Sequence, residues 1–149
     1  MEIRPLEANN IKACAEIFIQ TYNQAPWNYA WTPDDSVKYL KEYASSPQFK
    51  GFAIYEGSEI AGALLAHTKT WWNSTQLFID ELFVSPQFQK RGCGKQLMKY
   101  AEEYAEDNNL QTITLMTNKF MPAMNFYLDN DFIHAQPFVI LFKNIQPEI

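Results

Sequence analysis

The chain has 149 residues, of which 47% are apolar and 19% charged, so we expect a single globular domain over residues 1–149. The net charge of −5 and a basic cluster confined to Lys90–Lys99 argue against a duplex nucleic-acid-binding protein. Two cysteines and two isolated histidines indicate no disulfide framework and no metal site. The absence of a signal-like or membrane-spanning apolar run indicates a cytoplasmic protein that binds no membrane.

The N-terminal part is predicted to form a strand over residues 2–6 and then two helices. The first helix, over residues 8–23, carries an apolar stripe at three- and four-residue steps. The second begins after Thr32, a capping residue followed by Pro33 and two aspartates that suit the positive end of a helix, and runs to about Ala44. The stretch between the helices, QAPWNYAW, is a loop rich in aromatic residues.

Strand signals dominate the middle of the chain. KGFAIYEG and SEIAGALLAHTKTW flank a turn at residues 56–58 and predict a hairpin. TQLFIDELFV, residues 75–84, is nearly continuously apolar, so we expect a central strand covered on both faces.

A helix over KQLMKYAEEYAEDNN, a strand over QTITLMTN and a helix from Pro122 to about Asn130 come next. FIHAQ and PFVILFKN are predicted to close the chain as strands. This order predicts an α/β or α+β domain with three layers around a mixed sheet.

Two of the five glycines, Gly92 and Gly94, lie between the strongest strand and a strong helix. A helix begins with unpaired backbone N–H groups and a partial positive charge. No Ser, Thr, Asp or Asn stands at an obvious cap position here, and Gln89 and Arg91 are close by. The pattern favours a phosphate-binding loop over a plain tight turn. It matches neither the Walker loop nor the dinucleotide fingerprint.

The stretch FIDELFVSPQFQKRGCGKQL resembles the acetyl-CoA-binding signature of the GNAT superfamily of N-acetyltransferases. Gln89, Gly92 and Gly94 match the family pattern Q/R-x-x-G-x-G/A, and the order of elements resembles the family fold over nearly the whole chain. PAMNFYLDNDF is similar to a second family segment, although Asp131 stands where glycine is usual. The resemblance implies a mixed, splayed central sheet flanked by helices.

The resemblance also implies where the co-substrate acetyl-CoA binds. In the family, loop N–H groups hold the pyrophosphate, and the pantetheine arm pairs with the edge of a splayed strand. The residues carried over are Leu82, Phe83 and Val84 for the strand edge, Gln89, Lys90, Arg91, Gly92, Cys93, Gly94 and Lys95 for the loop, and Asn118 after the partner strand. Arg91 suits a charge-assisted bond to phosphate. Lys90, Lys95 and Lys99 are either candidates for the 3′-phosphate end or part of a solvated helix face.

Acetyl transfer to an amine needs a proton acceptor, a stabilised oxyanion and a proton for the leaving thiolate. Tyr127 stands where the family often places a tyrosine near the sulfur, which implies a general acid; the alternative is a core aromatic residue. Asp80 and Glu81, adjacent in a strand, are expected to face opposite sides of the sheet. Glu81, expected to share a side with Ile79 and Phe83, is the candidate base, with a structural role as the alternative. Asp80 is a candidate for attracting a cationic amine.

Aromatic residues are the candidates for the acceptor pocket. Trp27, Tyr29 and Trp31 lie in the loop that covers the acceptor in the family, and Trp71 at a strand end would form a second wall. Aromatic faces with carboxylates suit a cation, although packing beneath a loop is an equal alternative. QAPWN and the acidic charge are similar to aminoglycoside 6′-N-acetyltransferase-like members.

The sequence thus predicts an N-acetyltransferase that transfers acetyl from acetyl-CoA to a small cationic amine by direct transfer in a ternary complex, without a metal. A peptide or protein amine acetyltransferase and a non-catalytic acetyl-CoA sensor are the alternatives. Homodimers are common in the family, so a homodimer is a further expectation.

Overall fold

The computed structural model describes residues 1–146. They form two compact units, which divide after Met116 and are described separately. The first unit holds five strands, three α-helices and two short 3₁₀ helices, and the second holds α4 (Ala123–Asp129). In chain order the elements of the first unit are β1 (Glu2–Pro5), η1 (Ala8–Asn10), α1 (Ile11–Tyr22), α2 (Pro33–Ala44), β2 (Phe49–Glu56), β3 (Glu59–Trp71), β4 (Ser74–Val84), η2 (Pro86–Phe88), α3 (Cys93–Asp107) and β5 (Thr112–Leu115).

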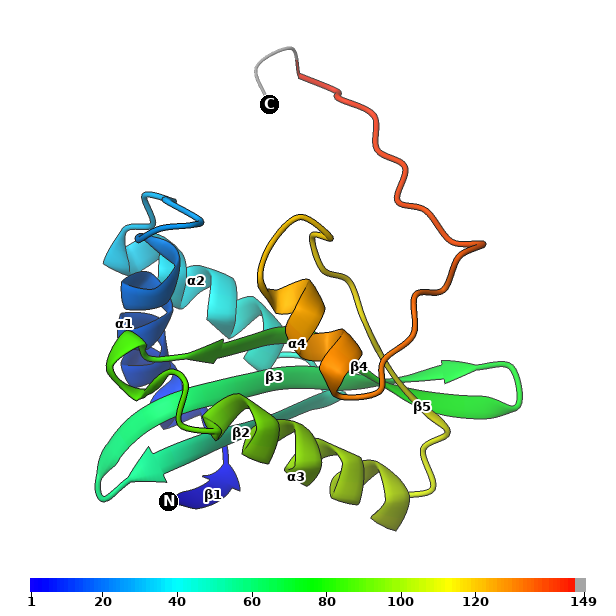
Figure 1. Cartoon of the computed structure of the whole chain (residues 1–149), viewed down its shortest axis with the longest axis horizontal. Coiled ribbons are helices and arrows are strands. Elements are labelled where there is room, and N and C mark those ends of the chain that lie inside the picture. Colours follow the sequence, from blue (N-terminus) through cyan, green and yellow to red (C-terminus); the bar gives the residue numbers. More distant parts are fainter. Residues whose placement is uncertain (147–149) are drawn as a thin grey trace. The chain divides into compact units, whose positions relative to one another are not determined.

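The five strands form one mixed sheet in the order β1-β2-β3-β4-β5. The first four pair antiparallel, and β5 pairs parallel to β4. The expected hairpin is confirmed, because β2 and β3 pair from the turn outward, starting with Glu56 opposite Glu59. In the view of Figure 1, the β3–β4 hairpin extends to the right beyond the other strands of the sheet.

Helices cover both faces of this sheet. Ala53 of β2 belongs to the core cluster that contains residues of α1 and α2. The ring of the preceding residue, Phe52, packs edge-on against Tyr100 of α3, with ring centroids 4.9 Å apart. Because successive strand residues point to opposite faces, α1 and α2 lie on one face and α3 on the other. The α+β architecture with three layers is confirmed.

Local chemistry sets the start of α2. The Thr32 hydroxyl accepts a hydrogen bond from the backbone N–H of Asp35, Pro33 occupies the first turn, and Asp34 and Asp35 lie at the positive end of the helix. These features match the expectation, and α2 ends at Ala44. A side-chain cap of about 1 kcal/mol thus fixes the helix that carries Tyr39 toward the sheet.

A β-bulge interrupts the regular alternation of β4. Leu65 of β3 pairs with Glu81, but the next residue, Ala66, pairs with Ile79, so Asp80 is an extra residue on β4. Such a bulge shifts the facing of the side chains that follow it and bends the strand. This feature was not predicted, because nothing in the string FIDELF marks it.

The expectation that β4 is central and covered on both faces is confirmed only in part, because β4 lies between β3 and β5 but is not the middle strand and is only partly buried. The middle strand is β3, whose residues 60–66 are all buried, whereas only Leu77, Ile79 and Phe83 are buried in β4. The reason is that β5 pairs with β4 only from Gln76 to Ile79. The rest of β4 has a β3 neighbour on one edge and no strand on the other among the described residues.

The two closing strands expected over FIHAQ and PFVILFKN are also wrong. No strand follows β5 within residues 1–146. Strand-forming side chains are present in this segment, but a strand also needs a hydrogen-bonded neighbour, and residues 117–146 hold no other strand. The helix expected from Pro122 is confirmed, with Pro122 as the residue before α4.

Candidate active site

The loop between β4 and α3 is built by backbone conformation. Lys90 and Gly92 both adopt left-handed conformations, with φ of 62° and 82°. Such residues turn neighbouring N–H groups toward one side and form an anion-binding concavity. Gly92 is also the residue before α3, no side chain caps this end, and the first helical bond is the 3.0 Å contact from Gln96 N–H to the Gly92 carbonyl. The preceding N–H groups are therefore oriented for a phosphate group.

Side chains around the loop leave this end open. The Gln89 side chain donates to the Val84 carbonyl at 3.0 Å and ties the loop to the end of β4. The Arg91 guanidinium lies over the Phe88 ring, 5.3 Å from its centroid. Lys90, Arg91, Lys95 and Lys99 are all exposed. The loop therefore presents positive charge to solvent, as an anion site requires.

Cys93 does not provide a reactive thiol. Its side chain is buried, and the thiol points toward the Phe88 carbonyl, with Sγ 3.7 Å from the oxygen. Burial raises the pKa of this thiol, and the nearby Arg91 opposes that effect only in part. A buried thiol with a raised pKa is a poor nucleophile. The contribution of Cys93 to the loop is thus its backbone N–H.

The predicted strand edge at Leu82, Phe83 and Val84 lies beyond the last residue of β4 that pairs with β5. The Val84 carbonyl accepts hydrogen bonds from the Gln89 side chain and, at 3.2 Å, from the Thr21 hydroxyl. The hydroxyl of Tyr22 lies 3.5 Å from the Leu82 carbonyl. β5 ends at Leu115, opposite Ile79, so the part of β4 beside the glycine loop has no strand on this edge among the described residues, and this open edge fits an extended ligand arm.

Glu81 is the most perturbed carboxyl group near this edge. Tyr39 of α2 donates a hydrogen bond of 2.7 Å to its Oε1 atom, and the Tyr39 and Tyr43 hydroxyls are 3.1 Å apart. Burial raises the pKa of Glu81 to about 7, and the bond from Tyr39 opposes the rise. A carboxyl group with a pKa near neutrality suits a general base.

Asp80 lies on the same face of the sheet as Glu81, which corrects the expectation of opposite faces. Its Oδ2 atom is 2.7 Å from Nδ1 of His67. His67 is two residues beyond Leu65 on β3, so both belong to the face covered by α1 and α2. The bulge is the physical reason, because it offsets the alternation by one residue. Phe83 also lies in this core cluster, whereas Ile79, expected on the same side as Glu81, does not.

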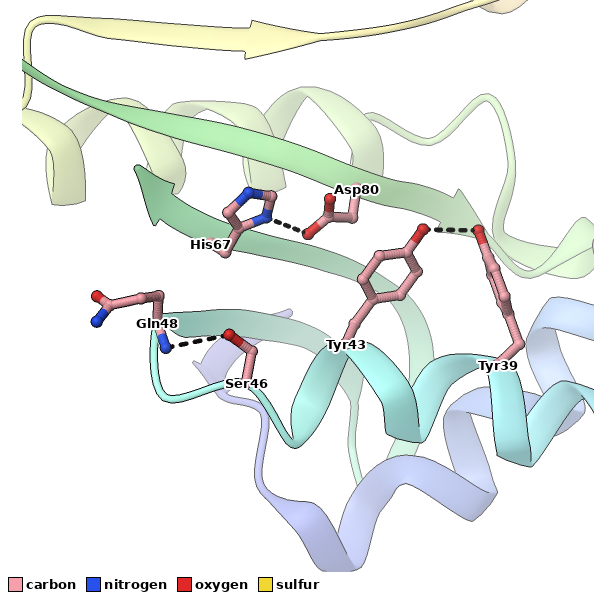
Figure 2. Close-up of polar contacts among 6 residues, drawn as sticks. All are labelled: Tyr39, Tyr43, Ser46, Gln48, His67 and Asp80. Carbon is pink, nitrogen blue, oxygen red and sulfur yellow. Dashed lines mark hydrogen bonds and ion pairs between the residues drawn. The ribbon is translucent and has the colours of Figure 1, made fainter. Parts of the chain in front are cut away.

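Figure 2 shows His67 and Asp80 pointing toward one another beside the tyrosines of α2. Burial raises the pKa of Asp80, and the bond to His67 opposes that effect. The Asp80 side chain is 8% exposed and that of His67 33%. Sequence reasoning missed this pair, because the two residues are 13 positions apart and meet only through the register of the hairpin.

Two of the predicted aromatic residues gather near Glu81. Trp31 lies 5.1 Å from the Tyr39 ring, and Trp27 lies 5.1 Å from the Tyr22 ring. Tyr22 and Tyr39 both pack on Phe18 in the same core. Trp31 therefore packs on Tyr39, whose hydroxyl contacts Glu81, and Trp27 packs on Tyr22.

The other two aromatic candidates lie elsewhere. Tyr29 is 58% exposed, and Trp71 is 73% exposed at the tip of the β3–β4 hairpin. Trp71 is six residues beyond Leu65, the partner of Glu81, which is roughly 20 Å along a strand. The structure thus links Trp31 to Glu81 through Tyr39 and packs Trp27 on Tyr22 in the same core, whereas Trp71 lies far along the hairpin.

Asn118 and Tyr127 belong to the second unit. The Asn118 side chain accepts a hydrogen bond of 2.9 Å from the backbone N–H of Phe120 and shapes the turn before α4. Tyr127 is buried, with its ring 5.3 Å from Phe126 and 5.5 Å from Phe132. Their expected roles therefore rest on the family resemblance.

Comparison with known proteins decides the family. The model of the Acetyltransferase (GNAT) family matches residues 12–132, which span both units. The chain belongs to the GNAT family of acetyltransferases. It is an acetyltransferase enzyme, and acetyl-CoA is the acetyl donor that this family generally uses.

Individual relatives agree with this assignment. An uncharacterized N-acetyltransferase from Archaeoglobus fulgidus is 27% identical over 136 residues, covering 88% of this chain and 92% of the relative. A possible acetyltransferase from Clostridium difficile has a TM-score of 0.80 at 17% identity, covering 97% and 98% of the two chains. An aminoglycoside acetyltransferase from an uncultured soil metagenomic sample, solved with sisomicin, has a TM-score of 0.77 at 16% identity, covering 97% and 96%. The two structures share the GNAT fold with this acetyltransferase.

Within residues 1–146, no three histidine, cysteine or acidic side chains gather in a way that would hold a metal ion. In the same part of the acetyltransferase, no helix has the length and apolar character to cross a membrane.

Proposed function

We propose that this acetyltransferase transfers the acetyl group of acetyl-CoA to a primary amine of a small cationic molecule, by direct transfer in a ternary complex. The single observation that carries this proposal is Glu81: a partly buried carboxyl group with a pKa near 7, bonded to Tyr39 and lying beside the open edge of β4. Such a group takes up a proton near neutral pH.

The residues that hold acetyl-CoA in this proposal are those of the loop and the strand edge. The backbone N–H groups from Gln89 to Gly94 bind the pyrophosphate, and Arg91 and Lys95 add charge. The backbone of Leu82–Val84 binds the pantetheine arm. Support comes from the left-handed Lys90 and Gly92 and from the absence of a side-chain cap on α3.

Acetyl-CoA supplies the acetyl group as a reactive thioester. The acceptor amine arrives as an ammonium ion, and Glu81 accepts the proton that it must lose before its nitrogen can attack. N–H groups along the open edge of β4 stabilise the negative charge that develops on the carbonyl oxygen. As the C–N bond forms and the C–S bond breaks, Tyr127 donates a proton to the leaving thiolate, and the second proton that the nitrogen loses restores the phenol. The place of Tyr127 in the sequence motif supports this role.

A cationic acceptor is supported by the charge and the rings near Glu81. Asp80 and Glu81 lie on one face, the Tyr39 hydroxyl contacts Glu81, and Trp31 and Trp27 pack on Tyr39 and Tyr22. Ring faces and carboxylates attract a cation together. The net charge of −5 acts in the same direction at longer range.

The test is thiol release from acetyl-CoA with a panel of aminoglycosides, polyamines, free amino acids and short peptides, alongside direct measurement of acetyl-CoA binding. We expect turnover with small polycationic amines that is lost in Glu81→Gln. Turnover with peptides alone would replace the proposal with a peptide acetyltransferase. Binding of acetyl-CoA without turnover of any amine would favour a non-catalytic sensor.

A further inference from the structure

The helices α1, α3 and α4 each end at an asparagine, and the one after α1 is used differently from the others. Asn108, after α3, and Asn130, after α4, each donate from the side-chain amide to a carbonyl four residues earlier, at 2.9 and 2.8 Å. Such bonds satisfy carbonyls of the last helical turn. Asn23, after α1, reaches eight residues forward instead, to the backbone of Trp31. Its amide therefore serves the following loop rather than the helix.

Two hydrogen bonds join the Asn23 side chain to one residue. Its Nδ2 atom donates to the Trp31 carbonyl at 2.9 Å, and its Oδ1 atom accepts from the Trp31 N–H at 2.9 Å. A backbone bond lies beside this pair, because the Tyr29 N–H donates to the Tyr22 carbonyl at 2.9 Å. These three bonds, called here the Asn23 clamp, hold together the two ends of residues 24–30.

The clamped residues form a compact surface loop whose ends lie close together. Inside it, the Asn28 N–H donates to the Gln24 carbonyl at 2.8 Å. Residues 24–26 and 28–30 are exposed, and Trp27 between them is half-buried. A segment with so little buried surface depends on a small number of contacts for its order. Loss of the Asn23 amide should therefore loosen the loop without unfolding the core.

The clamp holds the two tryptophans that pack on the tyrosines around Glu81. Trp31 packs on Tyr39, whose hydroxyl donates to Glu81 at 2.7 Å. Trp27 packs on Tyr22, and a hydrogen bond from Tyr22 also opposes the raised pKa of Glu81. Each of these tyrosines thus has a loop tryptophan against its ring. The Asn23 clamp is in this way connected to the carboxyl group through two separate pairs of rings.

We infer that Asn23 is a positioning residue for the acceptor amine: it fixes residues 24–31 as a preformed wall beside Glu81, rather than as a lid that becomes ordered on binding. A loop that is already ordered removes part of the entropic cost of binding a ligand. The inference rests on the proposed function, in which Glu81 accepts the proton of that amine. It adds to that function a residue, remote from the chemistry, that sets the affinity for the acceptor.

The first experiment is steady-state kinetics of Asn23→Leu with spermidine and with sisomicin as acceptors. Leucine has a similar size, fits the φ of −84° at this position and removes both side-chain bonds. We expect KM for the acceptor to rise about tenfold, while kcat and the Kd of acetyl-CoA stay within about twofold. Asn23→Asp is the milder variant. It keeps the acceptor for the Trp31 N–H and loses the donor, so a rise of about threefold is expected.

The second experiment measures the clamp without any amine. Hydrogen exchange of the Trp31 N–H, followed by nuclear magnetic resonance, is expected to be at least about tenfold faster in Asn23→Leu. The matched control is Asn108→Leu, which also removes an amide at the end of a helix but leaves the loop untouched. We expect its KM and its Trp31 exchange to equal those of the wild type. Thermal denaturation of both variants separates a loosened loop from a lost fold.

Unchanged exchange of the Trp31 N–H in Asn23→Leu would overturn the inference, because the clamp would then hold nothing. An unchanged KM with faster exchange would overturn it as well, and so would a fall in kcat at constant KM. A wild type that acetylates no amine would remove the proposed function and this inference with it. A wild type that is active, with the same KM in Asn23→Leu, would remove the inference alone.

Discussion

The glycine loop and the face around Glu81 are built in different ways. In the loop, the proposed phosphate site is made by backbone conformation: left-handed residues at 90 and 92, and the uncapped start of α3. Around Glu81, the proposed acceptor site is made by side chains that come from α1, α2, β3 and β4 and meet only in three dimensions. The backbone site is local in sequence and therefore visible as a motif, whereas the side-chain site is not. The donor half of such an enzyme is thus readable from sequence long before the acceptor half.

The change with the largest expected effect is Glu81→Gln. It removes the proton acceptor but keeps an oxygen for Tyr39, so we expect kcat/KM to fall by about 10²–10⁴, the usual contribution of a general base. Acetyl-CoA affinity is expected to stay unchanged, because the loop is untouched. Steady-state kinetics and calorimetry check both. Glu42→Gln, on the exposed side of α2, is the control; equal activity of the two variants would remove Glu81 from the chemistry.

Tyr127→Phe tests the role assigned by resemblance. Losing the phenol while keeping the ring should lower kcat by roughly 10–100-fold, within the range for general acids, with acetyl-CoA binding retained. Single-turnover kinetics is the measurement. Phe126→Leu in the same helix is the control for packing, and a thermal midpoint near that of the wild type is required. If kcat is unchanged, Tyr127 is a core aromatic residue.

Gly92→Val tests the backbone site. At φ of 82° a β-branched residue is strained, although no atom lies closer than 4.0 Å to the added Cβ. We expect acetyl-CoA affinity to fall about tenfold or more, which corresponds to about 1.4 kcal/mol. Gly57→Val is a matched control, since Gly57 also has a left-handed φ, 61°, and open surroundings, but lies in the β2–β3 turn.

Both glycine variants are expected to lose similar stability, and only Gly92→Val to lose affinity. Calorimetric titration with acetyl-CoA and thermal denaturation of the two proteins provide the comparison. Equal affinity in both would show that the loop backbone does not hold the phosphates.

The smallest expected effect is a shift in pH dependence. Glu81 acts as a base only when ionised, so kcat/KM should rise as pH increases through about 7 and level off above it. Tyr39→Phe removes a bond that favours the carboxylate, so the rise should move to higher pH by up to roughly one unit. Tyr43→Phe, which contacts Tyr39, should move it less. A shift to lower pH in Tyr39→Phe would contradict the assignment.

Much of the fold was predictable because its signals are local. The start of α2 follows from Thr32 and Pro33, and the β2–β3 hairpin from its turn residues. The left-handed turn before α3 was expected from Gly92 and Gly94, and its binding of phosphate stays a prediction. In each case the determining residues are within a few positions of one another.

The rest depends on contacts between distant residues. The pairing of His67 with Asp80 and the shared face of Asp80 and Glu81 follow from a bulge that no sequence pattern marks. The closing strands over FIHAQ and PFVILFKN were predicted from strand-forming composition, but composition does not say whether a neighbouring strand is available. Trp71 was predicted to line the acceptor pocket together with Trp27 because both side chains are aromatic. The sequence did not show how far along the hairpin Trp71 lies.

The bulge on β4 has a meaning for how this enzyme can diversify. Without Asp80, Leu65 and Ala66 would still pair with Glu81 and Ile79, now in an unbroken ladder. Every other side chain of β4 would keep its present face, because alternation is restored when one residue is removed. Asp80 is thus equivalent to a single inserted codon in an ordinary strand. A lineage can gain or lose this carboxylate, and the His67 contact with it, in one genetic step that leaves the order of the core intact.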